Sequence, residues 1–313
     1  MTLRRELPEQ VINIIAQRSQ RFHHYLWHRV RNSWLQLTEG EQRSVRHINP
    51  LWVPERPALD RMRRPNRENG SGEDFLFMTR QMIAMVNNIL AQVDDRDDRR
   101  VKGWERVPGP DDPNYPVPSF QGSGLEEVKT REYYEQYMAG WDSLYRQPVY
   151  LRSVTLGQLG SDIEFTIYND AHMRWAAPSH VGYRPTTAIM GDIDRRWDSP
   201  AYDYLGDTYS SLVNPIFWKL NGWVSDRVED WKRANGIMGE IEWERWSVGS
   251  LDLYGDFDSL QVTAATKISR ACVADEFLKI DRIISESGAS DLDGFFRPTP
   301  RPQNRLSDIK SGY

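Results

Sequence analysis

The segment from Asp74 to Gln92 constrains the fold of this chain more than any other, because it is apolar on more than one side. It reads DFLFMTRQMIAMVNNILAQ, and its apolar residues recur at the spacing of an α-helix. A helix on a protein surface keeps a polar face toward water, whereas a helix that is apolar around much of its circumference is buried on several sides. We therefore expect residues 74–92 to form a central helix that other helices surround.

Three other long segments have the same period and are expected to pack against this central helix. A shorter amphipathic helix is predicted for residues 125–145, and two short β-like runs for residues 149–168. Pro-rich stretches separate several of these segments, so we expect long loops between them. The sequence thus predicts a mainly α fold with a four-helix core, long irregular loops and few short strands. The three long segments are residues 9–37, 214–234 and 259–287.

We expect residues 1–294 to form a single helical domain, because a chain of 313 residues can bury one large hydrophobic core. The remaining tail, 295–313, is rich in Pro and Arg. Its composition predicts a segment that is either disordered or draped over the body as a lid, with Phe295 and Phe296 suited to closing a groove.

Net charge and cysteine content exclude several classes of protein. A net charge near −5 and a pI near 5.8 give no basic surface for a nucleic acid or an anionic membrane. No apolar run approaches the ~20 residues that a membrane span needs, and the N-terminus lacks the apolar core of a secretory signal. The single Cys272 excludes an intrachain disulfide. We expect a cytoplasmic protein, and the sequence predicts nothing about its oligomeric state.

Two short motifs in the second half of the chain carry a family resemblance. The first, Tyr-Asn-Asp-Ala-His, occupies residues 168–172, and the second, Asn-Pro-Ile-Phe-Trp-Lys-Leu-Asn, occupies residues 214–221. They resemble the second copper half-site of the type-3 copper family, the tyrosinases and haemocyanins, which has the patterns His-Asn-x-x-His and Asp-Pro-x-Phe-x-x-x-His. The resemblance extends over residues 20–235. It is closest to bacterial tyrosinase-like proteins of specialised metabolism, such as those of the pyoverdine-maturation kind.

The resemblance implies an antiparallel four-helix core of the type-3 copper kind in which most copper ligands are replaced. In that family, three histidines bind each copper. Here Tyr168 takes one ligand position and His172 keeps the next, while Asn221 and Thr79 take the places of two more. Gly70 stands where the family has another histidine. Because at least four of the six ligands are absent, the resemblance implies no functional dicopper site.

The replacement side chains indicate what the former copper cavity contains. Tyr168, Asn221, Thr79 and His172 would converge on this cavity if the helix geometry of the family is kept. All four can form hydrogen bonds, whereas a cavity filled only by packing would favour Leu, Val or Phe. They favour a pocket for a polar ligand, or else an internal hydrogen-bond network with buried water.

The first functional hypothesis is a metal-independent tailoring enzyme of specialised metabolism, which cyclises or isomerises an aromatic or polyene small molecule. It requires no cofactor. The candidate proton-transfer residues are His172, Tyr168 and Asp170, and nearby Asp162 and Glu164 are further acid–base candidates. The expected substrate-binding residues are Asn221, Thr79, Trp218, His28 and Trp175.

Two alternatives belong to other classes of protein. One is a pseudoenzyme that binds a phenolic substrate or a partner protein without catalysis. The other is an oxidoreductase for phenolic substrates with a single copper or zinc ion on His24, His28 and His172, since three imidazole nitrogens suit either metal. His24 and His28 also have the spacing of neighbours on one face of an amphipathic helix, which is the more common reason for such a pair.

Overall fold

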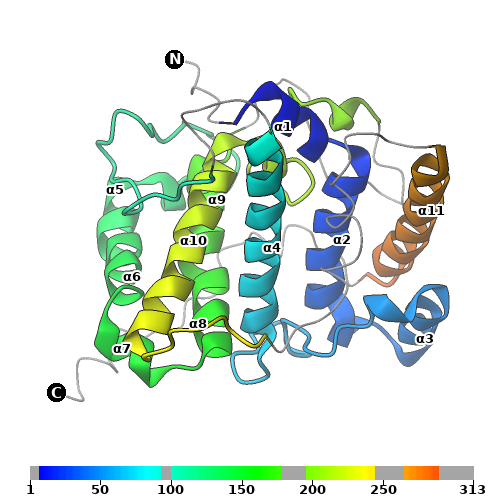
Figure 1. Ribbon diagram of the computed structural model, residues 1–313, viewed down its shortest axis with the longest axis horizontal. Coiled ribbons are helices and arrows are strands. Elements are labelled where there is room, and N and C mark those ends of the chain that lie inside the picture. The colour runs from blue at the N-terminus through cyan, green and yellow to red at the C-terminus, as the bar shows by residue number, and fades with distance from the viewer. Residues whose placement is uncertain (1–6, 93–99, 178–194, 244–263, 289–313) are drawn as a thin grey trace.

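A computed structural model of the protein describes residues 7–92, 100–177, 195–243 and 264–288, with side chains from residue 275 onward in the last range. These ranges are mainly helical, as the sequence predicts (Figure 1). They contain no strand, although Leu59 and Pro65 form an isolated antiparallel bridge. The expectation of a few short strands is therefore wrong for the described ranges. The tail 295–313 lies outside them, and a single domain over 1–294 stays a prediction.

The expected central helix is α4 (Ser71–Gln92), which lies near the middle of the molecule (Figure 1). The side chains of residues 74–79 are all buried, so every face of this part of α4 is covered by protein. α4 packs against α8 (Leu156–Ile163) and against α10 (Pro215–Ala234). The prediction of a central helix is confirmed.

The prediction of a single helix at 9–37 is wrong in one respect, because the structure has two helices there. α1 (Glu9–Ile15) ends shortly before Gln17, whose backbone, with φ −57° and ψ 138°, is not helical. α2 (Arg18–Ser33) follows. Arg21 stabilises the break, since its buried Nε donates a hydrogen bond to the carbonyl oxygen of Ala16 at 3.0 Å.

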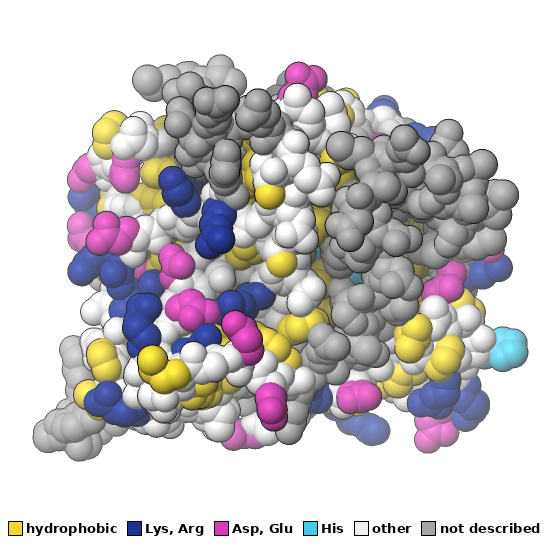
Figure 2. Space-filling model, viewed as in Figure 1, with side chains coloured by type: hydrophobic (Ala, Val, Ile, Leu, Met, Phe, Trp, Pro, Cys, Tyr) yellow, Lys and Arg dark blue, Asp and Glu magenta, His cyan; other side chains and the backbone are white. Residues whose placement is uncertain are grey.

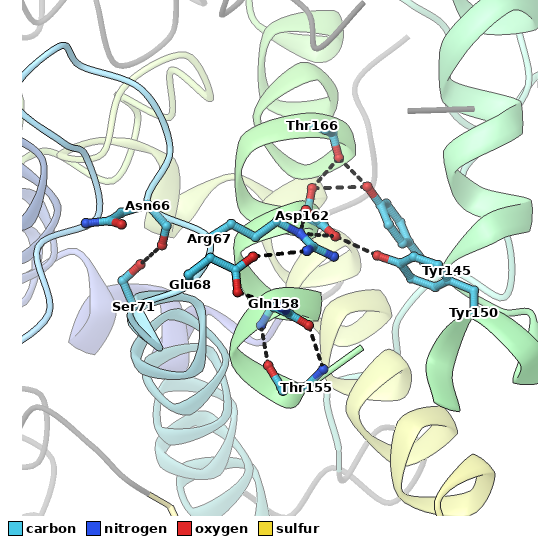
Figure 3. Close-up of polar contacts among 10 residues, drawn as sticks. All are labelled: Asn66, Arg67, Glu68, Ser71, Tyr145, Tyr150, Thr155, Gln158, Asp162 and Thr166. Carbon is cyan, nitrogen blue, oxygen red and sulfur yellow. Dashed lines mark hydrogen bonds and ion pairs between the residues drawn. The ribbon is translucent and has the colours of Figure 1, made fainter. Parts of the chain in front are cut away.

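The β-like runs predicted at 149–168 are wrong, because this stretch is mostly helical. α8 begins after a capping box, in which Thr155 Oγ1 accepts from Gln158 N and Gln158 Oε1 accepts from Thr155 N (Figure 3). The box satisfies backbone groups that a helix start leaves unpaired, and so favours helix over an extended chain. The other helical elements here are α7 (Pro148–Ser153), a π-helical segment (Glu164–Tyr168) and α9 (Asn169–Trp175).

The two long helices of the C-terminal half lie close to where the periodicity predicts them. α10, predicted at 214–234, begins directly after Asn214. The Asn214 side chain caps the helix, because its Oδ1 accepts a hydrogen bond from the backbone N–H of Ile216. α11 (Ala264–Glu286), predicted at 259–287, packs against α2 and against α3 (Glu39–Ile48), a helix that the sequence reasoning missed. The expectation that this segment packs against the central helix is wrong, because its main neighbours are α2 and α3 rather than α4.

The helix predicted at 125–145 consists of consecutive helical pieces rather than one continuous α-helix. The main pieces are α5 (Arg131–Tyr133), a π-helical turn (Tyr134–Met138) and α6 (Ala139–Leu144).

Among the described ranges, no helix combines the length and the apolar character that crossing a bilayer requires.

α4 and α8 approach each other so closely that only glycine fits at their contact. A Cβ on Gly160 would lie 2.0 Å from the carbonyl oxygen of Gly72, and a Cβ on Gly72 would lie 2.0 Å from the backbone nitrogen of Ser161. Both clashes are with backbone atoms, which cannot rotate away as a side chain can. The two glycines thus set the distance between α4 and α8, and with it the position of the π-helical segment that continues α8.

We expect Gly160→Ala to lower the free energy of unfolding by about 3 kcal/mol, because α4 and α8 must separate to admit the methyl group. Urea unfolding followed by circular dichroism measures this change. Gly239→Ala is the matched control, since a Cβ at Gly239 meets nothing within 4 Å. A Gly160→Ala protein as stable as this control would contradict the close contact.

Candidate functional site

A cluster of buried polar side chains lies where three parts of the chain meet, and we call it the histidine cluster. α2 contributes its two histidines, the π-helical segment and α9 contribute a tyrosine and a histidine, and α10 contributes an asparagine. Each of these side chains is at most 5% exposed. The members are His24, His28, Tyr168, His172 and Asn221.

Ring contacts place the members of the histidine cluster close together. The ring centroids of His24 and His28 are 4.8 Å apart, and those of Tyr168 and His172 are 4.7 Å apart. Phe217 connects the two pairs, since its ring centroid lies 5.4 Å from that of His24 and 5.9 Å from that of His172. Residues from α2, α9 and α10 therefore share one interior space around the Phe217 ring.

Two backbone carbonyls fix the tautomers of His24 and His172. His24 Nδ1 lies 2.6 Å from the carbonyl oxygen of Thr208, and His172 Nδ1 lies 2.8 Å from that of Leu205. A carbonyl oxygen only accepts, so each Nδ1 carries the proton and each Nε2 keeps its lone pair. His24 Nε2 is buried and makes no hydrogen bond within the part of the chain that the structure describes. The cluster thus offers nitrogen acceptors to the interior.

Burial keeps the three histidines neutral. Loss of hydration lowers the pKa of His24 to about 3 and that of His172 to about 4, and it holds the pKa of His28 well below 6.5. A base with so low a pKa takes a proton inefficiently near neutral pH. These imidazoles are therefore better suited to accept a hydrogen bond or to bind a metal than to remove a proton.

The side chains of Tyr168 and Asn221 form a hydrogen bond that meets only part of their hydrogen-bonding capacity. The Tyr168 hydroxyl donates to Asn221 Oδ1 at 3.4 Å, and Asn221 Nδ2 donates to the carbonyl oxygen of Phe217 at 2.7 Å. Burial raises the pKa of Tyr168, so its hydroxyl stays protonated. Buried Thr79 lies one helical turn beyond Phe75, whose ring packs against Tyr168 at 4.9 Å. The contact between Tyr168 and Asn221 is long for a hydrogen bond, which leaves both groups able to accept a better partner.

Three of the residues that the sequence singled out bond to other parts of the molecule. Asp170 accepts a hydrogen bond from the hydroxyl of Tyr133, since it lies two residues from His172 and so on the other side of α9. The remaining two are tryptophans whose indole N–H groups donate to backbone carbonyls. Trp175 donates to Tyr115 at 3.1 Å, and Trp218 donates to Leu212 at 2.7 Å.

The sequence reasoning missed the partner of Glu164, a buried arginine. Arg31 Nη1 and Nη2 lie 2.8 Å and 3.2 Å from the two carboxylate oxygens of Glu164. The nearer oxygen lies 4.0 Å from His28 Nδ1. Burial raises the pKa of Glu164, and the positive charge of Arg31 opposes this rise. The spacing of Glu164, Tyr168 and His172, four residues apart each time, was the signal that could have found this acid beside the cluster.

Comparison with known proteins adds no family assignment. No protein-family model matches the chain, and no curated protein is significantly similar to it in sequence.

Among the described residues, no group of three or more His, Cys, Asp and Glu side chains is arranged to hold a metal ion.

We expect Glu164→Gln to lower the free energy of unfolding by about 3–5 kcal/mol, because it leaves the buried charge of Arg31 without its counter-ion. The double variant Arg31→Met, Glu164→Gln removes both charges, and we expect it to be more stable than Glu164→Gln alone. Chemical unfolding of all four members of the cycle measures the coupling. Glu39→Gln, in the exposed pair of Glu39 with Arg43, is the control and should change little.

Protonation of the neutral histidines should destabilise the protein in mild acid. The folded-state pKa values of His24 and His172, about 3 and about 4, lie below the unfolded value of 6.5, so their contribution is fully present above pH 6.5. It is lost as the pH falls from 6.5 toward 4, by about 1 kcal/mol per histidine between pH 7 and 5.5. Urea unfolding at several pH values tests this, with His172→Phe expected to flatten the dependence. An equal slope in His47→Phe and His172→Phe would contradict the assignment, since His47 is exposed.

Proposed function

We propose that this chain is a tyrosinase-like protein whose dicopper site has become a metal-independent site for a small molecule. It acts in the cytoplasm as a tailoring enzyme of specialised metabolism, and cyclises or isomerises an aromatic or polyene substrate. The observation that carries the proposal is the meeting of Tyr168, His172 and Asn221 with His24 and His28 in one buried cluster. The family resemblance assigns the first three of these residues to positions of copper ligands.

The packing of the helices supports the fold part of this proposal. α10 packs against both α4 and α9, and α4 packs against α8, which the π-helical segment joins to α9. α2 reaches α10 through the contact of His24 with Phe217. We propose that α2, α4, the α8–α9 unit and α10 are the antiparallel four-helix core of the type-3 copper kind.

The chemistry of the histidine cluster supports an uncharged, hydroxylated substrate. Neutral imidazoles accept a hydrogen bond from a phenol or an enol, and the protonated Tyr168 hydroxyl donates one to a carbonyl oxygen. Phe217 and Phe75 supply aromatic surface beside these groups. In the proposed reaction Asn221 orients the substrate, the His172 imidazole accepts a hydrogen bond from it, and the Tyr168 hydroxyl donates one, so that both polarise the bond that rearranges. Because its pKa is lowered to about 4, His172 is a hydrogen-bond acceptor rather than the proton-transfer group that the sequence predicts. We assign Asp170 a structural role, since it bonds to Tyr133.

One observation favours a second candidate, an oxidoreductase with a single copper or zinc ion. Histidines that ligate a metal commonly donate their other N–H group to a carbonyl or a carboxylate, as His24 and His172 do. Their Nε2 atoms, with His28 as a third ligand, would then bind the ion after the side chains rearrange, because the three are not arranged to hold a metal ion in the described structure. The proposal of a metal-independent site and this candidate differ in a property that is simple to measure.

We expect a screen of phenolic and polyene compounds to identify ligands that raise the melting temperature. His172→Phe keeps an aromatic ring but removes the acceptor nitrogen, and it should weaken binding of the best ligand at least about tenfold, the effect of losing one buried hydrogen bond. Titration calorimetry measures the affinity, and His47→Phe is the matched control. Unchanged affinity in His172→Phe, or no ligand in the screen, would refute a small-molecule site at the cluster.

Metal analysis of protein from copper- and zinc-supplemented medium separates the two candidates. We expect less than about 0.1 metal ion per chain, far below the stoichiometric occupancy of a functional site. About one ion per chain that is lost in His24→Phe and in His172→Phe, and retained in His47→Phe, would replace the metal-independent proposal by the second candidate.

A further inference from the structure

A second polar feature lies on the surface along the C-terminal half of α10, beyond Asn221, the residue that α10 contributes to the histidine cluster. It is a recess of about 340 Å³, which is in the size range of small-molecule sites. Figure 2 shows acidic and basic side chains interspersed over the part of the surface where α6 and α10 lie. We call it the charged recess, and its lining includes Glu105, Arg146, Asp226, Arg227, Asp230 and Arg233.

Arg227 is buried in the charged recess with only part of its guanidinium paired. The residue is 5% exposed, and its guanidinium lies over the ring of Trp223 at 5.1 Å. Nη2 lies 2.7 Å from Asp230 Oδ2, whereas Nε and Nη1 are buried and make no hydrogen bond in the described part of the chain. Buried donors without an acceptor are unfavourable and uncommon. The arrangement therefore calls for an additional acceptor, such as a carboxylate.

The same recess holds two exposed carboxylates that form no ion pair within the described part of the chain. The side chains of Glu105 and Asp226 make no hydrogen bond or ion pair with any residue that the structure describes. By contrast, Asp230 pairs with Arg227 and also with Arg233. Partial loss of hydration raises the pKa of Asp226, and the positive charges of Arg227 and Arg233 oppose this rise without forming an ion pair with it. Within the described residues, the recess thus combines an arginine with unused donors and two carboxylates outside any ion pair.

We infer that the charged recess binds a small zwitterion that carries a carboxylate and an ammonium group, as a free amino acid does. The carboxylate accepts hydrogen bonds from Arg227 and Arg146, and the ammonium group donates to Asp226 and Glu105. A simple anion would meet the acidic side chains of the recess, and a simple cation would meet its arginines. A zwitterion satisfies both sets at once, so the arrangement favours it over either.

The test uses the standard free L-amino acids, each added to the full-length protein at low ionic strength, because salt weakens such contacts. Melting temperature ranks them, and titration calorimetry measures the affinity of the best one. We expect its N-acetyl derivative, which lacks the ammonium group, and its amide, which lacks the carboxylate, to bind at least tenfold more weakly. The variants Asp226→Asn and Arg227→Met should each weaken binding by a similar factor.

Arg131→Met and Asp111→Asn serve as controls, because they change an ion pair outside the recess and should leave binding unaltered. The exposed Asp226 keeps the test valid if Arg227→Met fails to fold. Any of four results would overturn the inference: no amino acid binds, the N-acetyl derivative or the amide binds as tightly as the free amino acid, or Asp226→Asn binds it with unchanged affinity.

Discussion

The buried ion pair of Arg31 and Glu164 is the interaction on which the arrangement of the interior depends. It joins α2 to the π-helical segment through two nitrogen–oxygen contacts, and Arg31 Nη2 also donates to the carbonyl oxygen of Ser71 at the start of α4, 2.8 Å away. The guanidinium lies over the ring of Trp27 at 4.2 Å. Removing two charges from water is unfavourable unless nearly every hydrogen-bonding position is used, which restricts how the three helical elements can be placed. Two of these elements carry members of the histidine cluster, since His28 lies on α2 and Tyr168 ends the π-helical segment.

A second set of contacts fixes the helical stretch formed by the end of α8 and the π-helical segment. Asp162 accepts from Arg67 Nε at 2.9 Å and from the Tyr150 hydroxyl at 2.7 Å (Figure 3). The hydroxyl of Thr166 bonds to the Asp162 carbonyl oxygen, next to the start of the π-helical segment. Two acids only two residues apart therefore have different partners: Asp162 binds the loop before α4, and Glu164 binds α2. Asp162 is a structural residue, although its position before the motif had suggested acid–base chemistry.

Local signals made the long helices predictable, whereas tertiary contacts decided what the sequence missed. α10 follows from its period and from the Asn214 cap, which are both local. The break before α2 does not follow from local sequence. Arg21 stabilises it by donating hydrogen bonds to the backbone carbonyl oxygens of three residues far along the chain, Ser199, Tyr202 and Tyr209. The meeting of Tyr168 with Asn221 was anticipated from the family resemblance, and the structure places them in contact. The pairing of Arg31 with Glu164 was not, since nothing local distinguishes Arg31 from the chain's other arginines.

The ion pair also affects the charge of His28, the histidine of the cluster that lies 4.0 Å from Glu164. A carboxylate 4.0 Å from His28 would by itself favour the protonated imidazole. The positive charge of Arg31 cancels that influence and contributes, after burial and His24, to lowering the pKa of His28. The charges of Arg31 and Glu164 thus offset each other beside the histidine cluster, and the imidazoles remain neutral acceptors. Such a site favours an uncharged donor such as a phenol over a charged molecule, whereas the charged recess on α10 has the opposite preference. The two sites therefore suit different classes of ligand.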